Sequence, residues 1–294
     1  MDFYGTIGPA CAQPAILQHM VEAGMTGSRM NLSHGPLAAH TDWLAMIRAA
    51  GIRQLLIDLQ GPELRIGTLA EPVALVEGSS VRLGADGGPC PAALRQAAAP
   101  GQQLLLDDGK LLVQVTQALP EALVCTVVRG GTLQSRKSIA APGLAVPSPT
   151  LTEEDLQNLK IAKQCGVTGV RLPFVRGKAD ILALRHALEE AGAADIRIFA
   201  KIENMTGVRA LPEFIHLVDE VVIARGDLGN AMPLWELPRC QKQLSAACRA
   251  AGVPFMVVPQ MLARMPTRAV PTSPCLTFAE CLRKRDGALC QNTV

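Results

Sequence analysis

The sequence predicts an α/β fold in which a parallel sheet is interrupted by a small β-rich domain. Short, nearly continuous apolar runs alternate with helical stretches, a pattern typical of strands that are buried on both faces. Successive runs start about 25–35 residues apart, which is the length of one βα unit. Residues 68–136 differ, because they hold short β-type runs separated by Gly, Pro and Asp. These observations favour repeated βα units with one insertion.

The expected strands and helices follow one another along the chain. Short apolar runs predict strands at residues 3–7, 28–32, 54–59, 168–174, 196–202, 220–224 and 254–258. Apolar residues at helical spacing predict helices at residues 13–23, 36–50, 153–165, 179–191, 205–217 and 235–251. Gly24 and Gly51 end the first two helices, as glycine commonly does. Strands that are separated by helices pair in parallel.

Residues 68–136 predict a separate β-rich domain. Its short runs lie at residues 73–76, 81–83, 103–106, 111–115 and 122–128, with one turn at 91–98 that could be helical. A long irregular excursion is the alternative, but structureless loops of this length are uncommon. We therefore expect four parts: a first α/β part at 1–67, the insert at 68–136, a second α/β part at 137–269 and a divergent tail at 270–294.

The composition excludes several classes of protein. The 294 residues are 49% hydrophobic and 18% charged, which is typical of a folded globular chain and not of a disordered one. A net charge of +2 and an aromatic content of 3% argue against a nucleic-acid partner. No apolar run is long enough to span a membrane, and the N-terminus lacks the pattern of a signal peptide. The 9 cysteines never form a C-x-x-C pair, so we expect free thiols in a reducing cytoplasm.

Polar side chains collect where the predicted strands end. In chain order these strand ends carry Arg29, Asn31 and Ser33, then Asp58, then Lys201 and Glu203, then Arg225 and Asp227, and finally Gln260. Because several successive strands contribute, the pattern favours a closed TIM (β/α)8-type barrel with its site on that face. A doubly wound open sheet is the alternative, and it would place a ligand mainly at one switch point.

The residue types at these strand ends indicate metal-assisted chemistry. Lys201 and Glu203 are two positions apart on one strand, so both side chains point the same way. A surface ion pair is the alternative, although the apolar residues around this pair disfavour it. Asp227 adds a second carboxylate one βα unit later, and Gly226 lets a backbone N–H approach a ligand closely. Two carboxylates suit Mg²⁺ or Mn²⁺, and a neighbouring lysine would stabilise developing negative charge. The sequence contains neither a P-loop nor a Rossmann glycine motif.

Several longer motifs then resemble, in the same order, those of the pyruvate kinase family. They are TIGPA at 6–10, SRMNLSHG at 28–35, DLQGPELR at 58–65, DDG at 107–109, KIEN at 201–204, ARGDLG at 224–229 and QML at 260–262. The resemblance implies a barrel with a β-rich lid domain inserted after the third strand. It also implies phosphoryl transfer from phosphoenolpyruvate to ADP, giving pyruvate and ATP, which is the final step of glycolysis.

The resemblance implies a role for each site residue, carried over by position. Lys201 would stabilise the transition state and the enolate, Arg29 would contact the transferring phosphate, and the Gly226 N–H would meet the substrate carboxylate beside Asp227. Glu203 and Asp227 would hold Mg²⁺. The residues implied on the side of the nucleotide phosphates are Asn31, Ser33, His34, Arg65 and Lys137. Those implied around K⁺ are Asn31, Ser33, Asp58 and the backbone carbonyl of Leu59, and Glu63 goes with K⁺ dependence in this family.

The sequence also departs from the family pattern. Leu59 and Gln60 replace a Thr-Lys pair, and Pro259 stands where the family has a threonine beside the substrate's methylene carbon. The tail at 270–294 has no convincing eighth strand, and it does not resemble the family's C-terminal domain. Two alternatives to an active kinase therefore stay open: an impaired paralogue that binds Mg²⁺ and a 2-oxo acid or phosphoenolpyruvate, and a Mg²⁺-dependent 2-oxo acid lyase or aldolase. A homo-oligomer is compatible with the resemblance.

Overall fold

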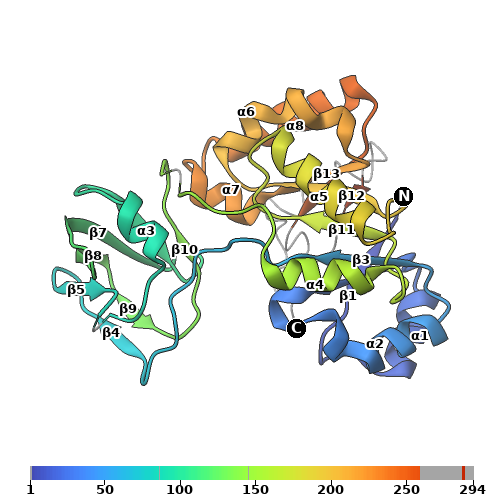
Figure 1. Ribbon diagram of the computed structural model, residues 1–294, viewed down its shortest axis with the longest axis horizontal. Coiled ribbons are helices and arrows are strands. Elements are labelled where there is room, and N and C mark those ends of the chain that lie inside the picture. The colour runs from blue at the N-terminus through green and yellow to red at the C-terminus, as the bar shows by residue number, and fades with distance from the viewer. Residues whose placement is uncertain (1, 86, 145, 259–286, 289–294) are drawn as a thin grey trace, which may run out of the picture. The chain divides into compact units, whose positions relative to one another are not determined.

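The structure, a computed structural model, describes residues 2–85, 87–144, 146–258 and 287–288 (Figure 1). The chain divides into two compact units. The larger unit contains the segment up to Gly61, Thr150–Arg225 and the residues from Pro238 onward, and the smaller unit contains Pro62–Pro149 and Gly226–Leu237. The predicted insert at 68–136 falls inside the smaller unit. Among the described helices, none is both long enough and apolar enough to cross a bilayer.

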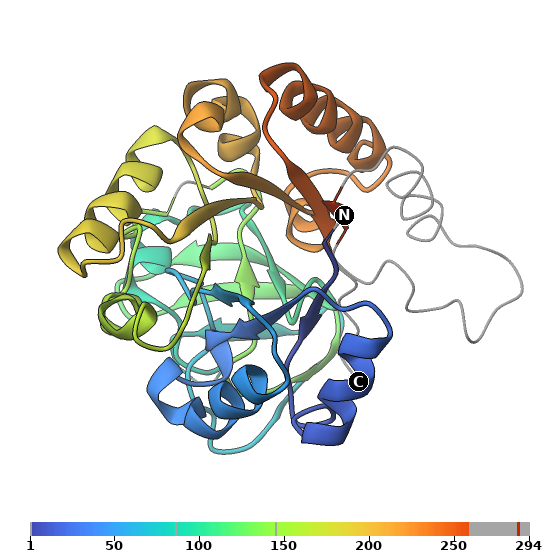
Figure 2. The same ribbon diagram turned by 90° about the vertical axis from the view of Figure 1, so that its right-hand side faces the viewer.

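The larger unit is built on one parallel sheet whose strands pair in chain order. They are β1 (Tyr4–Thr6), β2 (Gly27–Asn31), β3 (Gln54–Asp58), β11 (Gly169–Leu172), β12 (Arg197–Ile202), β13 (Glu220–Ala224), β14 (Phe255–Val258) and β15 (Gly287–Ala288). The sheet curls, and helices cover its outer face (Figure 2). This arrangement confirms the predicted α/β barrel class.

The last strand corrects one expectation. The sequence predicts no convincing eighth strand in the tail, yet Gly287 and Ala288 pair in parallel with Met256 and Val257 of β14. Such a short strand carries no apolar run of its own, so hydrophobic patterning could not identify it. The pairing uses backbone N–H and C=O groups, which every residue type other than proline supplies. Residues 276–282, which could form a short helix on sequence grounds, lie outside the described part of the chain.

Helices follow the strands as the apolar spacing predicts. They are α1 (Pro14–Glu22), α2 (Thr41–Ala49), α4 (Glu153–Ala162), α5 (Lys178–Glu190), α6 (Met205–Phe214) and α8 (Leu237–Ala251). The predicted helix at 36–50 is divided into the short 3₁₀ turn η2 (Leu37–His40) and α2, and the one at 205–217 into α6 and η3 (Ile215–Leu217). A further helix, α7 (Arg225–Ala231), begins directly after β13.

The interior of the curled sheet is an apolar layer beneath the predicted site. Its buried residues come from β1, β3, β12, β13 and β14, and they are Tyr4, Leu56, Phe199, Val222, Ala224, Met256 and Val258. Side chains on a strand alternate between faces, so residues two positions beyond a member of this layer point to the same interior. Asp58 follows Leu56 in this way, and Lys201 follows Phe199.

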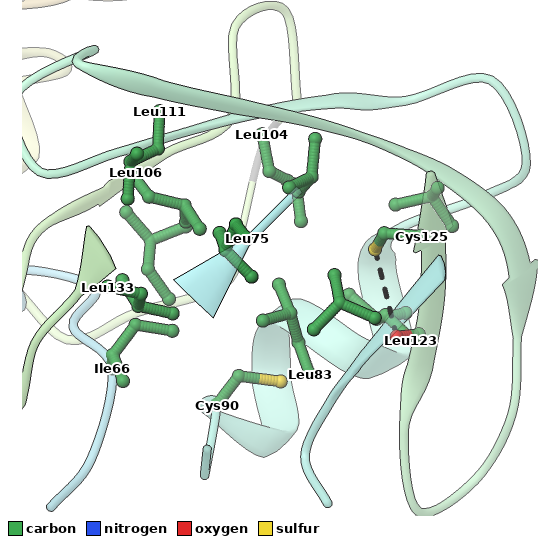
Figure 3. Close-up of a cluster of buried hydrophobic side chains, with 14 of the residues drawn as sticks. Ile66, Leu75, Leu83, Cys90, Leu104, Leu106, Leu111, Leu123, Cys125 and Leu133 are labelled. Atoms are coloured by element: carbon green, nitrogen blue, oxygen red, sulfur yellow. Dashed lines mark hydrogen bonds between the residues drawn. The ribbon is translucent and has the colours of Figure 1, made fainter. Parts of the chain in front are cut away.

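The smaller unit is an antiparallel β structure with its own core. Its strands are β4 (Val73–Leu75), β5 (Ser80–Leu83), β6 (Gln103–Leu106), β7 (Leu111–Ala118), β8 (Leu123–Arg129), β9 (Gly131–Leu133) and β10 (Ile139–Ala140). One sheet has the order β10-β6-β7-β8-β5, β4 pairs with β9, and the short helix α3 (Ala92–Ala97) lies at the predicted turn. Figure 3 shows the leucines, Ile66, Cys90 and Cys125 that fill this core.

A fully buried carboxylate joins α4 to the segment that follows β3. Asp155 has an exposed fraction of 0%. Its Oδ1 accepts the Gln60 N–H at 3.0 Å, and its Oδ2 accepts the Gly61 N–H at 3.1 Å and the Thr152 N–H at 2.9 Å. Thr152 caps α4 in return, which completes a capping box. Asp155 therefore holds the start of α4 and the chain after β3 in place.

We expect Asp155→Ala to lower the free energy of unfolding by about 3 kcal/mol, because it leaves several backbone N–H groups without an acceptor. Urea denaturation monitored by circular dichroism measures the change. Glu154→Ala is the matched control, since Glu154 is exposed in the same helical turn. Equal stability of the two variants would contradict the role given to Asp155.

Glu220, the first residue of β13, makes stability depend on pH. Burial raises its pKa to about 7 from the ordinary 4.5, although Arg197 and Arg171 act against the shift. Between these two values the folded state retains a proton that the unfolded state releases. The contribution of Glu220 to stability is therefore greatest at low pH and is lost as the pH rises through the folded pKa.

We expect the wild-type protein to lose up to about 3 kcal/mol of stability from this group between about pH 5 and pH 8. Glu220→Gln should flatten that part of the profile, because glutamine does not titrate. Urea denaturation at a series of pH values measures it, with Glu213→Gln on exposed helix surface as the control. A wild-type profile that is already flat would show that Glu220 is ionised in the folded state.

Candidate active site

Asp58, at the end of β3, is the centre of a buried charge cluster. Its Oδ1 accepts hydrogen bonds from Arg29 Nε at 2.9 Å and from Arg171 Nη1 at 3.0 Å, and its Oδ2 accepts one from Arg29 Nη2 at 2.8 Å. Arg29 thus forms a bidentate ion pair with the carboxylate, which is the strongest hydrogen-bonding geometry for an arginine and a carboxylate. Arg29 also donates to Thr6 Oγ1 at 3.0 Å, which fixes its plane.

Lys201 and Glu203 extend the same cluster from β12. Lys201 Nζ lies 2.6 Å from Glu203 Oε1 and 3.7 Å from Asp58 Oδ2. The other oxygen of Glu203 accepts the backbone N–H of Phe174 at 2.8 Å. Phe174 has a φ of 53°, a left-handed conformation that is uncommon for a residue with a side chain and that turns this N–H toward Glu203. The pair is therefore an interior feature, and a surface ion pair is excluded by a Glu203 exposure of 4%.

The cluster carries a surplus of positive charge. Among the ion pairs described above, three cationic groups, Arg29, Arg171 and Lys201, face the two carboxylates of Asp58 and Glu203. Burial alone raises the pKa of Asp58, but the charges of Arg171, Arg29 and Lys201 outweigh it and hold that pKa well below its ordinary value. Asp58 therefore remains ionised, and the surplus charge favours an anionic ligand.

Arg171 is the member of the cluster that the sequence analysis missed. It lies in the middle of β11 with an exposure of 1%, and its backbone pairs in register with Asp58. Its Nε and Nη2 have no hydrogen-bond partner within the described part of the chain. An unsatisfied buried donor typically costs about 1–3 kcal/mol. An arginine inside an otherwise apolar strand was the sequence feature that could have revealed it.

The predicted nucleotide-side residues divide between the two units. In the larger unit, Asn31 caps the 3₁₀ turn η1 (Leu32–His34), because its Oδ1 accepts the Ser33 N–H at 3.2 Å. The turn therefore presents Ser33 and an exposed His34 directly after β2.

In the smaller unit, Arg65 and Lys137 lie on paired segments. Arg65 forms an antiparallel bridge with Ser138, and the Ile66 N–H donates to the Lys137 carbonyl at 2.8 Å. The Arg65 side chain pairs with Glu63 at 2.5 Å, while Lys137 Nζ lies 2.8 Å from Asp107 Oδ1. Both cations thus come from one antiparallel pairing in that unit.

The remaining predicted residues lie directly after strands β3, β13 and β14. Gly226 and Asp227 lie in the first turn of α7, directly after β13, and group with the smaller unit. Leu59 follows β3, and its N–H donates to the Arg171 carbonyl at 3.2 Å. Pro259 and Gln260 lie outside the described residues.

The donor atoms present suit one of the two implied metals better than the other. Within the described ranges, no group of three or more His, Cys, Asp or Glu side chains is arranged to hold a metal ion. Glu203 nevertheless provides a buried carboxylate at a strand end, which is the hard oxygen chemistry that Mg²⁺ takes together with substrate oxygens and water. Glu203 therefore suits Mg²⁺, and Asp227 belongs to the other unit.

The implied K⁺ ligands do not fit in the same way. Both oxygens of Asp58 already accept hydrogen bonds from guanidinium groups. The side-chain oxygen of Asn31 is engaged with the Ser33 N–H. A monovalent cation on Asp58 would also lie close to Arg29, Arg171 and Lys201, and like charges repel strongly where water is excluded. This cluster therefore disfavours a cation on Asp58.

Comparison with known proteins places the chain in a family. The family model described as "Pyruvate kinase, barrel domain" matches residues 2–279. The chain is 36% identical over 283 residues to a pyruvate kinase of Agrobacterium vitis, covering 91% of this chain and 58% of that protein. It is also 36% identical over 293 residues to the pyruvate kinase PKLR of Rattus norvegicus, covering 91% of this chain and 51% of that one.

The curated relatives are therefore considerably longer than this chain. A pyruvate kinase of Mycobacterium tuberculosis, 35% identical over 283 residues, is covered over 59% of its length. The match includes the parallel strands β1–β3 and β11–β14 of the larger unit and the antiparallel strands of the smaller one, since residues 2–279 span them. On these grounds the chain belongs to the pyruvate kinase family.

Proposed function

We propose that this chain transfers a phosphoryl group from phosphoenolpyruvate to ADP, giving pyruvate and ATP, as the final step of glycolysis. The observation that supports the proposal is the buried charge cluster. In it, Lys201 lies 2.6 Å from Glu203, and Arg29 forms an ion pair with Asp58. Its surplus positive charge suits a substrate that bears both a phosphate and a carboxylate. Phosphoryl transfer depends mainly on positioning and charge neutralisation, which such a cluster can supply.

Each residue has a defined part in this proposal. Arg29 contacts the transferring phosphoryl group with the guanidinium edge that Asp58 and Thr6 orient. Lys201 stabilises the negative charge that develops on the enolate oxygen as the phosphoryl group leaves. The Gly226 N–H meets the substrate carboxylate. The phosphates of the nucleotide are bound by Asn31, Ser33, His34, Arg65 and Lys137.

Mg²⁺ is held by Glu203 and Asp227 in this proposal. When bound, it neutralises charge on the substrate oxygens and orients them for transfer. The Phe174 N–H binds Oε2 of Glu203, which fixes the orientation of the carboxylate. Oε1, which contacts Lys201 in the structure, would then be the oxygen that binds the metal ion.

A pyruvate assay coupled to lactate dehydrogenase tests the proposed function. The full chain should form pyruvate from phosphoenolpyruvate only when both ADP and Mg²⁺ are present. Pyruvate release without ADP would instead indicate hydrolysis or a lyase-type reaction. Absence of pyruvate at high protein concentration would contradict the proposal.

One feature of the sequence favours a second candidate, a barrel that binds phosphoenolpyruvate and turns it over poorly. Pro259 lacks the hydroxyl that a threonine would offer for protonating the enolate. If that proton transfer limits the rate, Pro259→Thr should raise turnover by about tenfold. The same coupled assay measures it, and unchanged turnover would remove Pro259 as the cause.

A further inference from the structure

Arg171 donates a hydrogen bond to Asp58, the carboxylate on which the family resemblance would place K⁺. We propose that this barrel needs no K⁺ at Asp58, because the guanidinium of Arg171 supplies a fixed positive charge there. The inference rests on the proposed function, since it concerns how that same site balances its charge. It replaces the sequence-based expectation that Asn31, Ser33, Asp58 and the Leu59 carbonyl bind K⁺.

The first argument is the set of contacts around Asp58. Arg171 Nη1 and Arg29 Nε both donate to Oδ1, at 3.0 Å and 2.9 Å, and Arg29 Nη2 donates to Oδ2 at 2.8 Å. Lys201 Nζ lies 3.7 Å from the same Oδ2. A carboxylate can accept further bonds, so crowding alone does not exclude a cation. The three positive charges exclude it, because a K⁺ ion on either oxygen of Asp58 would lie close to Arg29, Arg171 and Lys201.

The second argument is that Arg171 depends on Asp58. Its exposure is 1%, and among the described residues its Nε and Nη2 have no hydrogen-bond partner. The single bond from Nη1 to Asp58 is therefore its main compensation for burial. An arginine side chain does not lose its proton in a protein. A K⁺ ion that drew Asp58 away would remove the hydrogen-bonded carboxylate from this buried cation, which is strongly unfavourable.

The third argument is the place of Arg171 in the fold. It pairs in register with Asp58 on β3 and with Phe199 on β12, two positions before Lys201. Regular strands on both sides fix its backbone, so its charge is a permanent part of the site. A K⁺ ion bound to Asp58 would add a second positive charge where Arg171 already supplies one.

Binding of phosphoenolpyruvate with Mg²⁺ tests the proposal on the full chain. Calorimetry is carried out in tetramethylammonium buffer with and without saturating K⁺. We expect the wild-type dissociation constant to change by less than about twofold, and that of Arg171→Met to tighten by about tenfold or more when K⁺ is added. A wild-type constant that tightens about tenfold with K⁺ would overturn the proposal, and so would an Arg171→Met protein as indifferent to K⁺ as the wild type.

Two further variants control for folding. Arg171→Lys retains the charge and should remain indifferent to K⁺; a K⁺ response equal to that of Arg171→Met would overturn the assignment. Arg197→Met removes another interior arginine, one that stacks over Phe199 with its Cζ 4.9 Å from the ring centre, and it should also remain indifferent. If K⁺ also tightened phosphoenolpyruvate binding to Arg197→Met, the loss of any interior arginine would create this K⁺ dependence. That result would overturn the specific role of Arg171. The wild-type measurement decides the central point even if Arg171→Met does not fold.

Thallium NMR separates this inference from the proposed function. Tl⁺ substitutes for K⁺ and can be followed without any substrate. If the wild type binds no phosphoenolpyruvate in either buffer, the proposed function fails, and Tl⁺ binding alone decides the cation question. We expect line broadening with Arg171→Met and none with the wild type; broadening with the wild type would overturn the inference.

Discussion

Replacing Lys201 with methionine should lower the rate at which the chain exchanges the methyl protons of pyruvate with solvent by about 10²–10³-fold. The exchange requires an enolate, which Lys201 stabilises in the proposed function. Its Nζ lies 2.6 Å from Glu203, so an oxyanion bound beside that carboxylate would lie close to the ammonium group. Proton NMR in deuterated buffer with pyruvate and Mg²⁺ measures the exchange.

Mg²⁺ binding separates a chemical role of Lys201 from a structural one. Lys201→Met leaves Glu203 with its bond from the Phe174 N–H, so the carboxylate should still bind Mg²⁺. Calorimetric titration with Mg²⁺ checks this. Lys163→Met is the matched control, because Lys163 forms only an exposed ion pair with Asp195. If exchange persists in Lys201→Met at the wild-type rate, Lys201 does not stabilise the enolate.

The second large effect is expected for Asp58→Asn, which should lower the free energy of unfolding by about 3–5 kcal/mol. The substitution preserves shape but removes the negative charge that pairs with Arg29 and Arg171, both of which are buried. The two guanidinium groups would then repel each other without the charged carboxylate that binds both of them. Urea denaturation of both proteins measures the loss.

The pH dependence of this difference follows from the lowered pKa of Asp58. A carboxyl whose pKa is lowered by folding stabilises the protein above its ordinary value of 3.8, and that contribution is lost as the pH falls toward the folded pKa. The difference in the free energy of unfolding between the wild type and Asp58→Asn should therefore become smaller only in strong acid. Asp195→Asn, on the surface, should match the wild type throughout. If the wild type and Asp58→Asn had the same free energy of unfolding at neutral pH, Asp58 would not be needed to neutralise the charges of Arg29 and Arg171.

Much of the fold could be predicted because its elements carry strong local patterns. Apolar runs such as 220–224 and 254–258 agree with β13 and β14 almost residue for residue. The eighth strand could not be predicted in this way. Gly287 and Ala288 have little strand character, and their pairing is determined by the edge of β14 and not by their own sequence.

The candidate site was predictable where residue spacing alone fixes direction. Lys201 and Glu203, two apart on one strand, do meet, as the alternation of side chains requires. Arg171 was missed because its role depends on register: only the pairing of β11 with β3 brings it beside Asp58. The turn at Phe174 was missed for a similar reason, since a backbone N–H leaves no trace in the residue type.

A crystal structure of the full chain with Mg²⁺ and oxalate tests the central claim most directly. Oxalate is a planar dianion that mimics the enolate of pyruvate. The account predicts oxalate and Mg²⁺ together at Glu203 and Asp227, with Lys201 Nζ within hydrogen-bonding distance of an oxalate oxygen. Oxalate bound elsewhere, or a metal ion that contacts neither carboxylate, would contradict it.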